Sequence, residues 1–129
     1  MFQVLIFIMA LVSVIPGSYT YASDSSNQLG TIEFPTSTSS RSAQKHFIRG
    51  VAALHSFWYT EALNAFEKST IADPNFAMGY WGLAMANNHP LWEDQDKKSA
   101  REALSKITDI SKLTQREQDY IHAVRLLYG

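Results

Sequence analysis

The chain of 129 residues contains no cysteine. A disulfide bond, a thiolate metal ligand and a cysteine-based redox site are therefore excluded. Charge of either sign is also in short supply, with 11 Lys and Arg against 12 Asp and Glu and a net charge of −1. Nucleic-acid binding needs a basic stripe, so we expect no nucleic-acid partner. A chain of this length has room for one small domain.

The sequence also lacks the short motifs that mark common active sites. It has no Gly-rich phosphate loop, no nucleophile elbow and no His-Glu-x-x-His segment. No pair of carboxylates stands out for general acid–base catalysis. We therefore expect a protein that is not an enzyme, with no catalytic residue, no cofactor and no metal ion.

Charged side chains are absent from residues 1–22, which contain an apolar run over residues 4–15. Pro16 and Gly17 break this run, and small residues precede a cleavage position after Ala22. The pattern is typical of a secretory signal peptide, and the run is shorter than the roughly 20 residues that span a bilayer. We expect an exported protein, periplasmic or secreted, with no membrane contact after cleavage. The alternative is an uncleaved N-terminal segment that anchors the chain to a membrane.

Residues 23–41 are expected to form a flexible or extended lead before the folded domain. Within it, Ile32 and Phe34 lie on one side of a short extended stretch that Pro35 ends. Residues 36–40 form a loop rich in Ser and Thr, which are good helix N-caps.

Helical spacing of apolar residues begins near residue 43. The pattern predicts a first helix that ends at a turn near 57–58, and further helices over about 59–72, 76–88, 96–107 and 114–129. Gly50 costs up to about 1 kcal/mol inside a helix, so we expect a second helix to approach closely there. Pro74 ends the second helix. Thr114 and Glu117 form a capping box that starts the last one.

The inward-facing side chains follow from the same spacing. In the second and fourth helices they are predicted to be Ala62, Ala65, Phe66, Ile71, Ala100, Ala103, Leu104 and Ile107. The apolar side chains of the last helix are Tyr120, Ile121, Val124, Leu127 and Tyr128. With no partner helix after them, they indicate a truncated sequence or self-association through the C-terminal helix.

A tetrad recurs along the chain. His55-Ser-Phe-Trp58 returns as His89-Pro-Leu-Trp92, and Phe47 and Trp81 share the same offset of 34 residues. A period of this size indicates a tandem repeat of a helix hairpin that buries its apolar face on its neighbours. Residues 42–129 are therefore predicted to form a helical repeat domain. It comprises a first repeat over 43–76, a degenerate second repeat over 77–110 and the first helix of a third unit over 114–129.

Residues 43–75 resemble a tetratricopeptide repeat (TPR). Gly50 stands at the family's small position in the first helix, Ala62 at the small contact between helices, and Phe66 at the large inward position of the second helix. More widely, residues 30–129 look like the N-terminal part of an exported group of TPR proteins with no established activity. The segments that carry this likeness are residues 30–35, 53–57, 77–82 and 88–92. The resemblance implies an all-α fold of antiparallel helix-hairpin repeats, a TPR-like α-solenoid of about five helices.

In this family the first helix of each hairpin lines a concave groove for a partner. The matching positions here, mostly apolar or aromatic, are Gln44, Phe47, Val51, Leu54, His55, Met78, Trp81, Met85, Asn88 and His89. None is Lys or Arg, so no carboxylate clamp is expected. The resemblance implies a scaffold for a protein or peptide partner, a hydrophobic helix or an extended segment. Alternatively, residues 30–35 or further C-terminal repeats cover this surface.

A different functional hypothesis makes the chain the non-catalytic N-terminal part of a longer exported enzyme or metal-dependent protein. His55 and His89 stand at the same repeat position, so their side chains are expected to approach each other. Either they form a metal-binding or pH-sensitive pair, or each caps a turn through a backbone hydrogen bond. A zinc site needs at least three protein ligands, and no third is evident. Trp58 and Trp92 are either platforms for a stacked ligand or fillers of the gap between turns.

Overall fold

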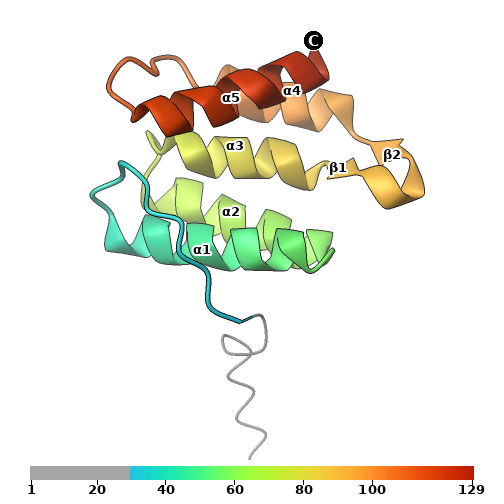
Figure 1. The fold of residues 1–129 in the computed structure, drawn as a ribbon, viewed down its shortest axis with the longest axis horizontal. Coiled ribbons are helices and arrows are strands. Elements are labelled where there is room, and N and C mark those ends of the chain that lie inside the picture. Colours follow the sequence, from blue (N-terminus) through green and yellow to red (C-terminus); the bar gives the residue numbers. More distant parts are fainter. Residues whose placement is uncertain (1–29) are drawn as a thin grey trace, which may run out of the picture.

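The computed structural model describes residues 30–129, and within them the chain is 65% helical, with five α-helices and one two-stranded sheet (Figure 1). The helices are α1 (Arg41–His55), α2 (Tyr59–Ala72), α3 (Ala77–Ala86), α4 (Lys97–Ser105) and α5 (Gln115–Tyr128). The predicted signal peptide and the first part of the lead lie outside the described residues. Among the helices of residues 30–129, none combines the length and apolar character needed to cross a membrane.

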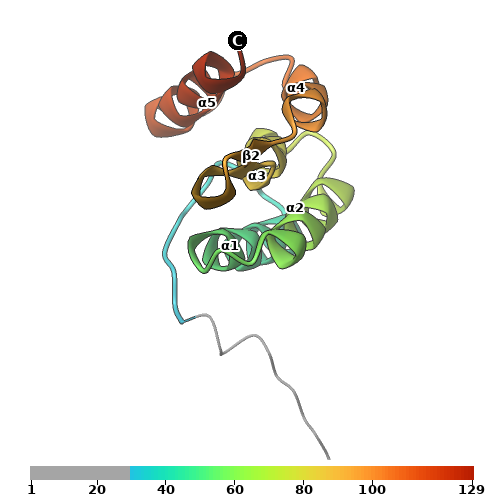
Figure 2. The same ribbon diagram turned by 90° about the vertical axis from the view of Figure 1, so that its right-hand side faces the viewer.

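Consecutive helices run in alternating directions and lie in layers (Figure 1). α1 and α2 form a hairpin, α3 packs on both of them, and α4 and α5 pack on α3. Seen at right angles, α2 and α4 lie on one side of the stack and the lead lies on the other (Figure 2). The surface next to the lead is therefore built from α1, α3 and α5, and is called the α1/α3/α5 face below.

Local sequence signals set the helix boundaries. The Ser40 side chain caps α1 by accepting a hydrogen bond from the Ala43 amide at 3.2 Å. The predicted capping box of α5 is confirmed, with both the Thr114 and the Glu117 side chains bonded to the other residue's backbone. α2 covers the predicted residues 59–72, as expected from the proline at position 74.

Phe66 of α2 is the centre of the core and is fully buried. A Cβ atom built on Gly50 of α1 would lie 2.6 Å from its ring, and one on Gly82 of α3 would lie closer still. Ordinary van der Waals contact begins near 3.4 Å, so only glycine permits this approach. The close approach predicted at Gly50 is confirmed, and the ring joins three helices.

Most predicted core positions are confirmed, including all four in the fourth predicted helix. The prediction that Ile71 faces inward is wrong, because this residue is 78% exposed. At 100° per residue it lies about 140° around α2 from Phe66. The inward place belongs to Ser69, whose buried hydroxyl donates to the Phe66 carbonyl at 2.7 Å. In the last helix Ile121 is buried, whereas Tyr120 and Leu127 are exposed on one side.

The connection between α3 and α4 differs from the expected turn. α3 ends at Ala86, two residues before the prediction, and a small hairpin follows. It pairs β1 (Asn88–His89) antiparallel with β2 (Asp94–Gln95) across a 3₁₀ turn, η2 (Pro90–Trp92). Pro90 has no amide hydrogen to continue α3, which gives a reason for the change of structure at this point.

Candidate interaction surface

Residues 30–40 of the lead run along the α1/α3/α5 face (Figure 1), and the Phe34 side chain packs against aromatic rings of its helices. The centroid of the Phe34 ring is 5.2 Å from that of Phe47 in α1, in an edge-to-face arrangement. It is 6.2 Å from Trp81 in α3 and 5.4 Å from Tyr120 in α5. These separations are those of favourable aromatic pairs. A single side chain of the lead therefore contacts an aromatic ring from each helix of the face.

Side chains of the face also hold the backbone of the lead. Gln44 of α1 donates from Nε2 to the Phe34 carbonyl at 2.8 Å. Arg116 of α5 donates to the next carbonyl, that of Pro35, and its guanidinium lies 4.9 Å from the centroid of the Phe34 ring. The Thr36 hydroxyl donates back to Gln44 Oε1. The face thus recognises both an aromatic ring and two consecutive carbonyls of an extended chain.

Glu117 ties the next part of the lead to α5. Its buried carboxylate accepts from the Ser37 amide at 2.8 Å and the Ser37 hydroxyl at 3.1 Å. It also accepts from the Thr114 hydroxyl at 2.7 Å and the Thr114 amide at 3.0 Å. Burial alone would raise the pKa of Glu117, but the hydrogen bonds from Ser37 and Thr114 outweigh it and hold this pKa below its ordinary value. The ionised form is therefore the one this site stabilises.

The lead is fixed at a further point close to α1. The Thr38 hydroxyl donates to Asp73 Oδ2 at 2.6 Å, which joins the lead to the end of α2. Ile32, on the same side of the chain as Phe34, packs against the core. Both Ile32 and Phe34 pack against the core, as expected for side chains on one side of the lead.

The predicted groove residues are divided between core and surface. Phe47, Val51, Met78 and Trp81 are buried in the core and offer almost no surface to a partner. Gln44, Leu54, Met85, Asn88 and His89 are partly buried, and His55 is exposed. Phe34 of the lead packs on Phe47 and Trp81. At these two residues the structure therefore matches the alternative in which residues 30–35 cover the predicted groove.

The repeat frame missed the residues that α5 contributes to this surface. Arg116, Glu117 and Tyr120 all contact the lead but were not among the predicted groove positions. Glu117 was assigned only to the capping box. Its second partner, Ser37, is 80 residues away in sequence, and no local pattern connects the two. Tyr120 was predicted as an apolar residue of the last helix, but groove positions were assigned only in the first and second repeats.

The two tetrads occupy unlike local structures. His55 is the last residue of α1, whereas His89 lies in β1. The His89 ring nitrogens lie 3.0 Å from the Ala86 carbonyl oxygen and 3.1 Å from Asp94 Oδ2. The expectation that the two histidines occupy the same place in successive repeats is therefore wrong, whereas the backbone contact of His89 agrees with the alternative in which it caps a turn. Across residues 30–129, no group of three or more His, Cys, Asp or Glu side chains is placed to hold a metal ion.

An exposed apolar patch lies at the end of the stack that carries both tetrads. Trp58 is 47% exposed and Trp92 61% exposed, so neither simply fills a gap. The Tyr59 ring packs against His89 at 4.1 Å and against Trp92 at 5.8 Å, which joins the two turns. Phe57 adopts a left-handed backbone with φ of 57°, an unusual conformation for a bulky side chain. This patch contacts no part of the lead in the interactions described above.

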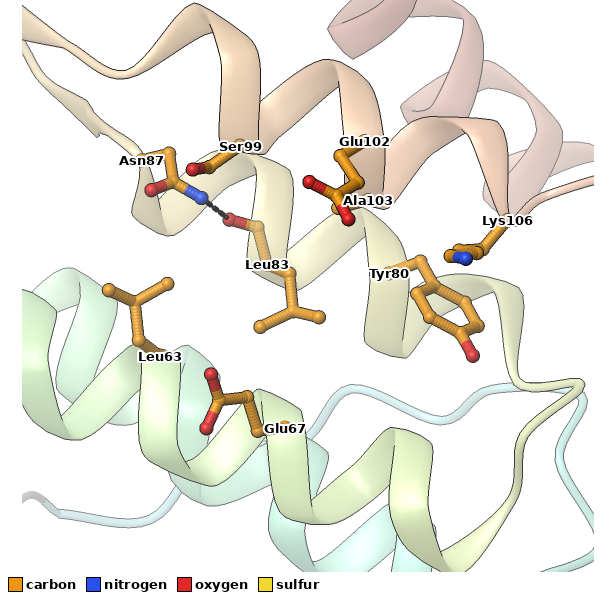
Figure 3. Close-up of a pocket in the computed structure, with 9 residues that line it drawn as sticks. All are labelled: Leu63, Glu67, Tyr80, Leu83, Asn87, Ser99, Glu102, Ala103 and Lys106. Atoms are coloured by element: carbon orange, nitrogen blue, oxygen red, sulfur yellow. Dashed lines mark hydrogen bonds between the residues drawn. The ribbon is translucent and has the colours of Figure 1, made fainter.

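A hollow of about 390 Å³ lies on the opposite side of α3, between α2 and α4 (Figure 3). Its lining residues are Leu63, Glu67, Tyr80, Leu83, Asn87, Ser99, Glu102, Ala103 and Lys106. Asn87 Nδ2 donates to the Leu83 carbonyl at 2.8 Å, which occupies that amide within α3 (Figure 3). The charged lining residues are exposed: Glu67, Glu102 and Lys106. The hollow has an apolar floor and a charged rim, without the converging polar groups of a built ligand site.

Comparison with protein-family models, with curated proteins and with solved structures found no match to this chain. Functional inference therefore depends on the geometry. The α1/α3/α5 face is in contact with the lead, a chain segment that lies outside the helices. On this face, aromatic rings lie beside side-chain donors to two consecutive backbone carbonyls of the lead.

Proposed function

We propose that this protein is a non-enzymatic interaction scaffold whose α1/α3/α5 face binds an extended segment of a protein or peptide partner. One observation carries the proposal. The face already binds an extended segment, its own lead, through the Phe34 ring and the carbonyls of Phe34 and Pro35. A surface that holds one extended chain has the donors and the pocket to hold another.

The chemistry supports this function because an extended peptide presents unpaired backbone carbonyls. Gln44 and Arg116 supply side-chain donors at the spacing of two successive carbonyls. The ring pocket between Phe47, Trp81 and Tyr120 supplies apolar contact. Donors to the backbone give affinity with little dependence on sequence, and a side-chain pocket adds specificity, which is the usual division in peptide recognition.

A TPR-like α-solenoid is the architecture we propose for this scaffold. The support is the antiparallel α1–α2 hairpin, the packing of α3 on both of its helices, and the 34-residue offset between Gly50 and the buried Ala84. The β1–β2 hairpin is a departure from a regular second repeat. Membership of an exported TPR family, export through residues 1–22 and self-association through α5 stay predictions.

Peptide selection on the purified protein tests the function. A library of displayed peptides is selected on the variant Phe34→Ala, in which the ring pocket is vacated. We expect selected peptides to lose binding when Gln44→Ala or Arg116→Ala is added. The matched control, Glu67→Ala in the hollow on the other side of α3, should leave binding unchanged. If the selected peptides bind equally well to all these variants, the α1/α3/α5 face is not the interaction surface.

A further inference from the structure

We propose that residues 31–35 of the lead are a tethered competitor, and that the partner they exclude carries an aromatic residue followed by proline in an extended segment. This inference rests on the proposed function and adds the chemistry of the partner and the regulation of the same face. In the absence of the partner the lead occupies the face, where it makes defined contacts.

The Phe34 ring behaves as a ligand anchor. It belongs to no helix, it remains partly exposed, and it contacts α1, α3 and α5 at once. Arg116 covers the ring with its guanidinium at 4.9 Å, an interaction that favours an aromatic side chain over an aliphatic one of similar size. The pocket therefore selects a ring.

Proline suits the position after the ring for two reasons. Its fixed φ keeps the chain extended, and it has no amide hydrogen that would be left without a partner. Its carbonyl remains available, and this is the group to which Arg116 donates. The preceding carbonyl, that of Phe34, accepts from Gln44 at 2.8 Å. The recognised unit is thus an aromatic–proline pair with both carbonyls exposed.

The structure of the lead allows its first part to leave while its second part stays. Ser37 and Thr38 are held by the carboxylates of Glu117 and Asp73, next to the start of α1. On the N-terminal side, Gly30 has a positive φ of 77° and open space around it. Residues 31–35 precede the fixed Ser37 and Thr38, so a partner can displace them without loss of the Ser37 and Thr38 contacts.

Tethering sets the size of the effect. A segment joined directly to its site competes at an effective concentration in the millimolar range. The apparent affinity for a free peptide falls in proportion to the fraction of molecules with an open site. Loss of the Phe34 ring removes the anchor of the competitor and leaves every recognising side chain of the face in place.

Binding of a labelled peptide with the sequence of residues 30–36 tests the inference by fluorescence anisotropy. We expect the purified Phe34→Ala variant to bind this peptide at least about tenfold more tightly than the unmodified protein. A peptide with alanine in place of its phenylalanine should bind neither. The matched control variant, Glu33→Ala, changes an exposed lead residue and should bind the peptide as weakly as the unmodified protein.

If the unmodified protein and the folded Phe34→Ala variant bind the labelled peptide with equal affinity, the proposed role of the lead as a competitor is overturned. Failure of the folded variant to bind the peptide would overturn the partner chemistry, whereas the library selection above would still decide the proposed function. Circular dichroism establishes folding, and Phe34→Leu, which keeps an apolar side chain, replaces the alanine variant if that one unfolds. A dimer of the unmodified protein that Phe34→Ala dissociates would assign the face to the lead of a second copy and overturn the inference.

Discussion

Replacement of Gly50 by alanine tests the packing that supports the whole stack. The new Cβ would lie 2.6 Å from the Phe66 ring, where ordinary contact begins near 3.4 Å. The ring or α1 must therefore move by about 0.8 Å. Gly82 of α3 approaches the same edge of the ring even more closely, so the ring has no free space on that side. A shift of α1 would also disturb Phe47, which packs on Phe66 with ring centroids 5.8 Å apart.

Two terms set the expected change in the free energy of unfolding. Overpacking of a dense core costs typically 1–3 kcal/mol, here about 2 to 3 because two helices close on one ring. Alanine regains up to about 1 kcal/mol of helix propensity over glycine. We therefore expect Gly50→Ala to destabilise the protein by about 1–2 kcal/mol, or to lower the melting temperature by roughly 4–16 °C.

Urea unfolding followed by far-UV circular dichroism measures this change. A double-mutant cycle with Phe66→Leu identifies the cause, because the smaller side chain relieves the clash. The combined variant should be less destabilised than the sum of the two single variants. If Gly50→Ala is as stable as the unmodified protein or more stable, α1 and α2 do not approach as described, and the reasoning fails.

Three further predictions concern acid stability, the α2 surface and the end patch. The pKa of Glu117 lies below its ordinary value of 4.5, so its ionised form stabilises the fold at neutral pH, and that contribution should disappear as the pH falls through the lowered pKa. Glu117→Gln should cost about 1–3 kcal/mol of stability at neutral pH and weaken the loss of stability in acid. If a pH series of urea melts shows the same loss of stability in acid for this variant, the Glu117 contacts are contradicted. Ile71→Ser should change stability by no more than about 0.5 kcal/mol, whereas Ile121→Ala should cost about 2–5 kcal/mol, and urea melts that reverse this order would show that α2 is rotated from its described position. Trp92→Ala should leave peptide binding to the Phe34→Ala variant unchanged, since the exposed patch of Trp58 and Trp92 is separate from the α1/α3/α5 face. Loss of binding in the anisotropy assay would show that the peptide also contacts this patch.

Local chemistry made the helices predictable. Caps at Ser40 and Thr114, the glycine at position 50 and the proline at position 74 act through near neighbours, and each marks a feature that the structure contains. Periodicity identified the core of α4 because its apolar residues are regularly spaced. The same method failed at Ile71, where a hydrogen-bonded serine, Ser69, occupies the inward position instead.

Long-range contacts were not predictable in the same way. The lead was expected to be extended, but the partners of Phe34 come from three helices, and those of Ser37 lie in α5. The repeat offset gave His55 and His89 the same repeat position, yet the second turn, which contains Pro90, is a hairpin. Identical residues in two copies therefore did not guarantee identical surroundings, because the tetrads differ at their two middle positions and the second contains a proline.

Nuclear Overhauser contacts from the Phe34 ring test most directly whether the α1/α3/α5 face holds an extended segment. In the purified protein we expect cross-peaks from this ring to the Trp81 indole and to the Tyr120 ring, whose centroids lie 6.2 Å and 5.4 Å away. Addition of excess aromatic–proline peptide should weaken these cross-peaks. A Phe34 ring with no contacts to either helix in the folded protein would contradict the account.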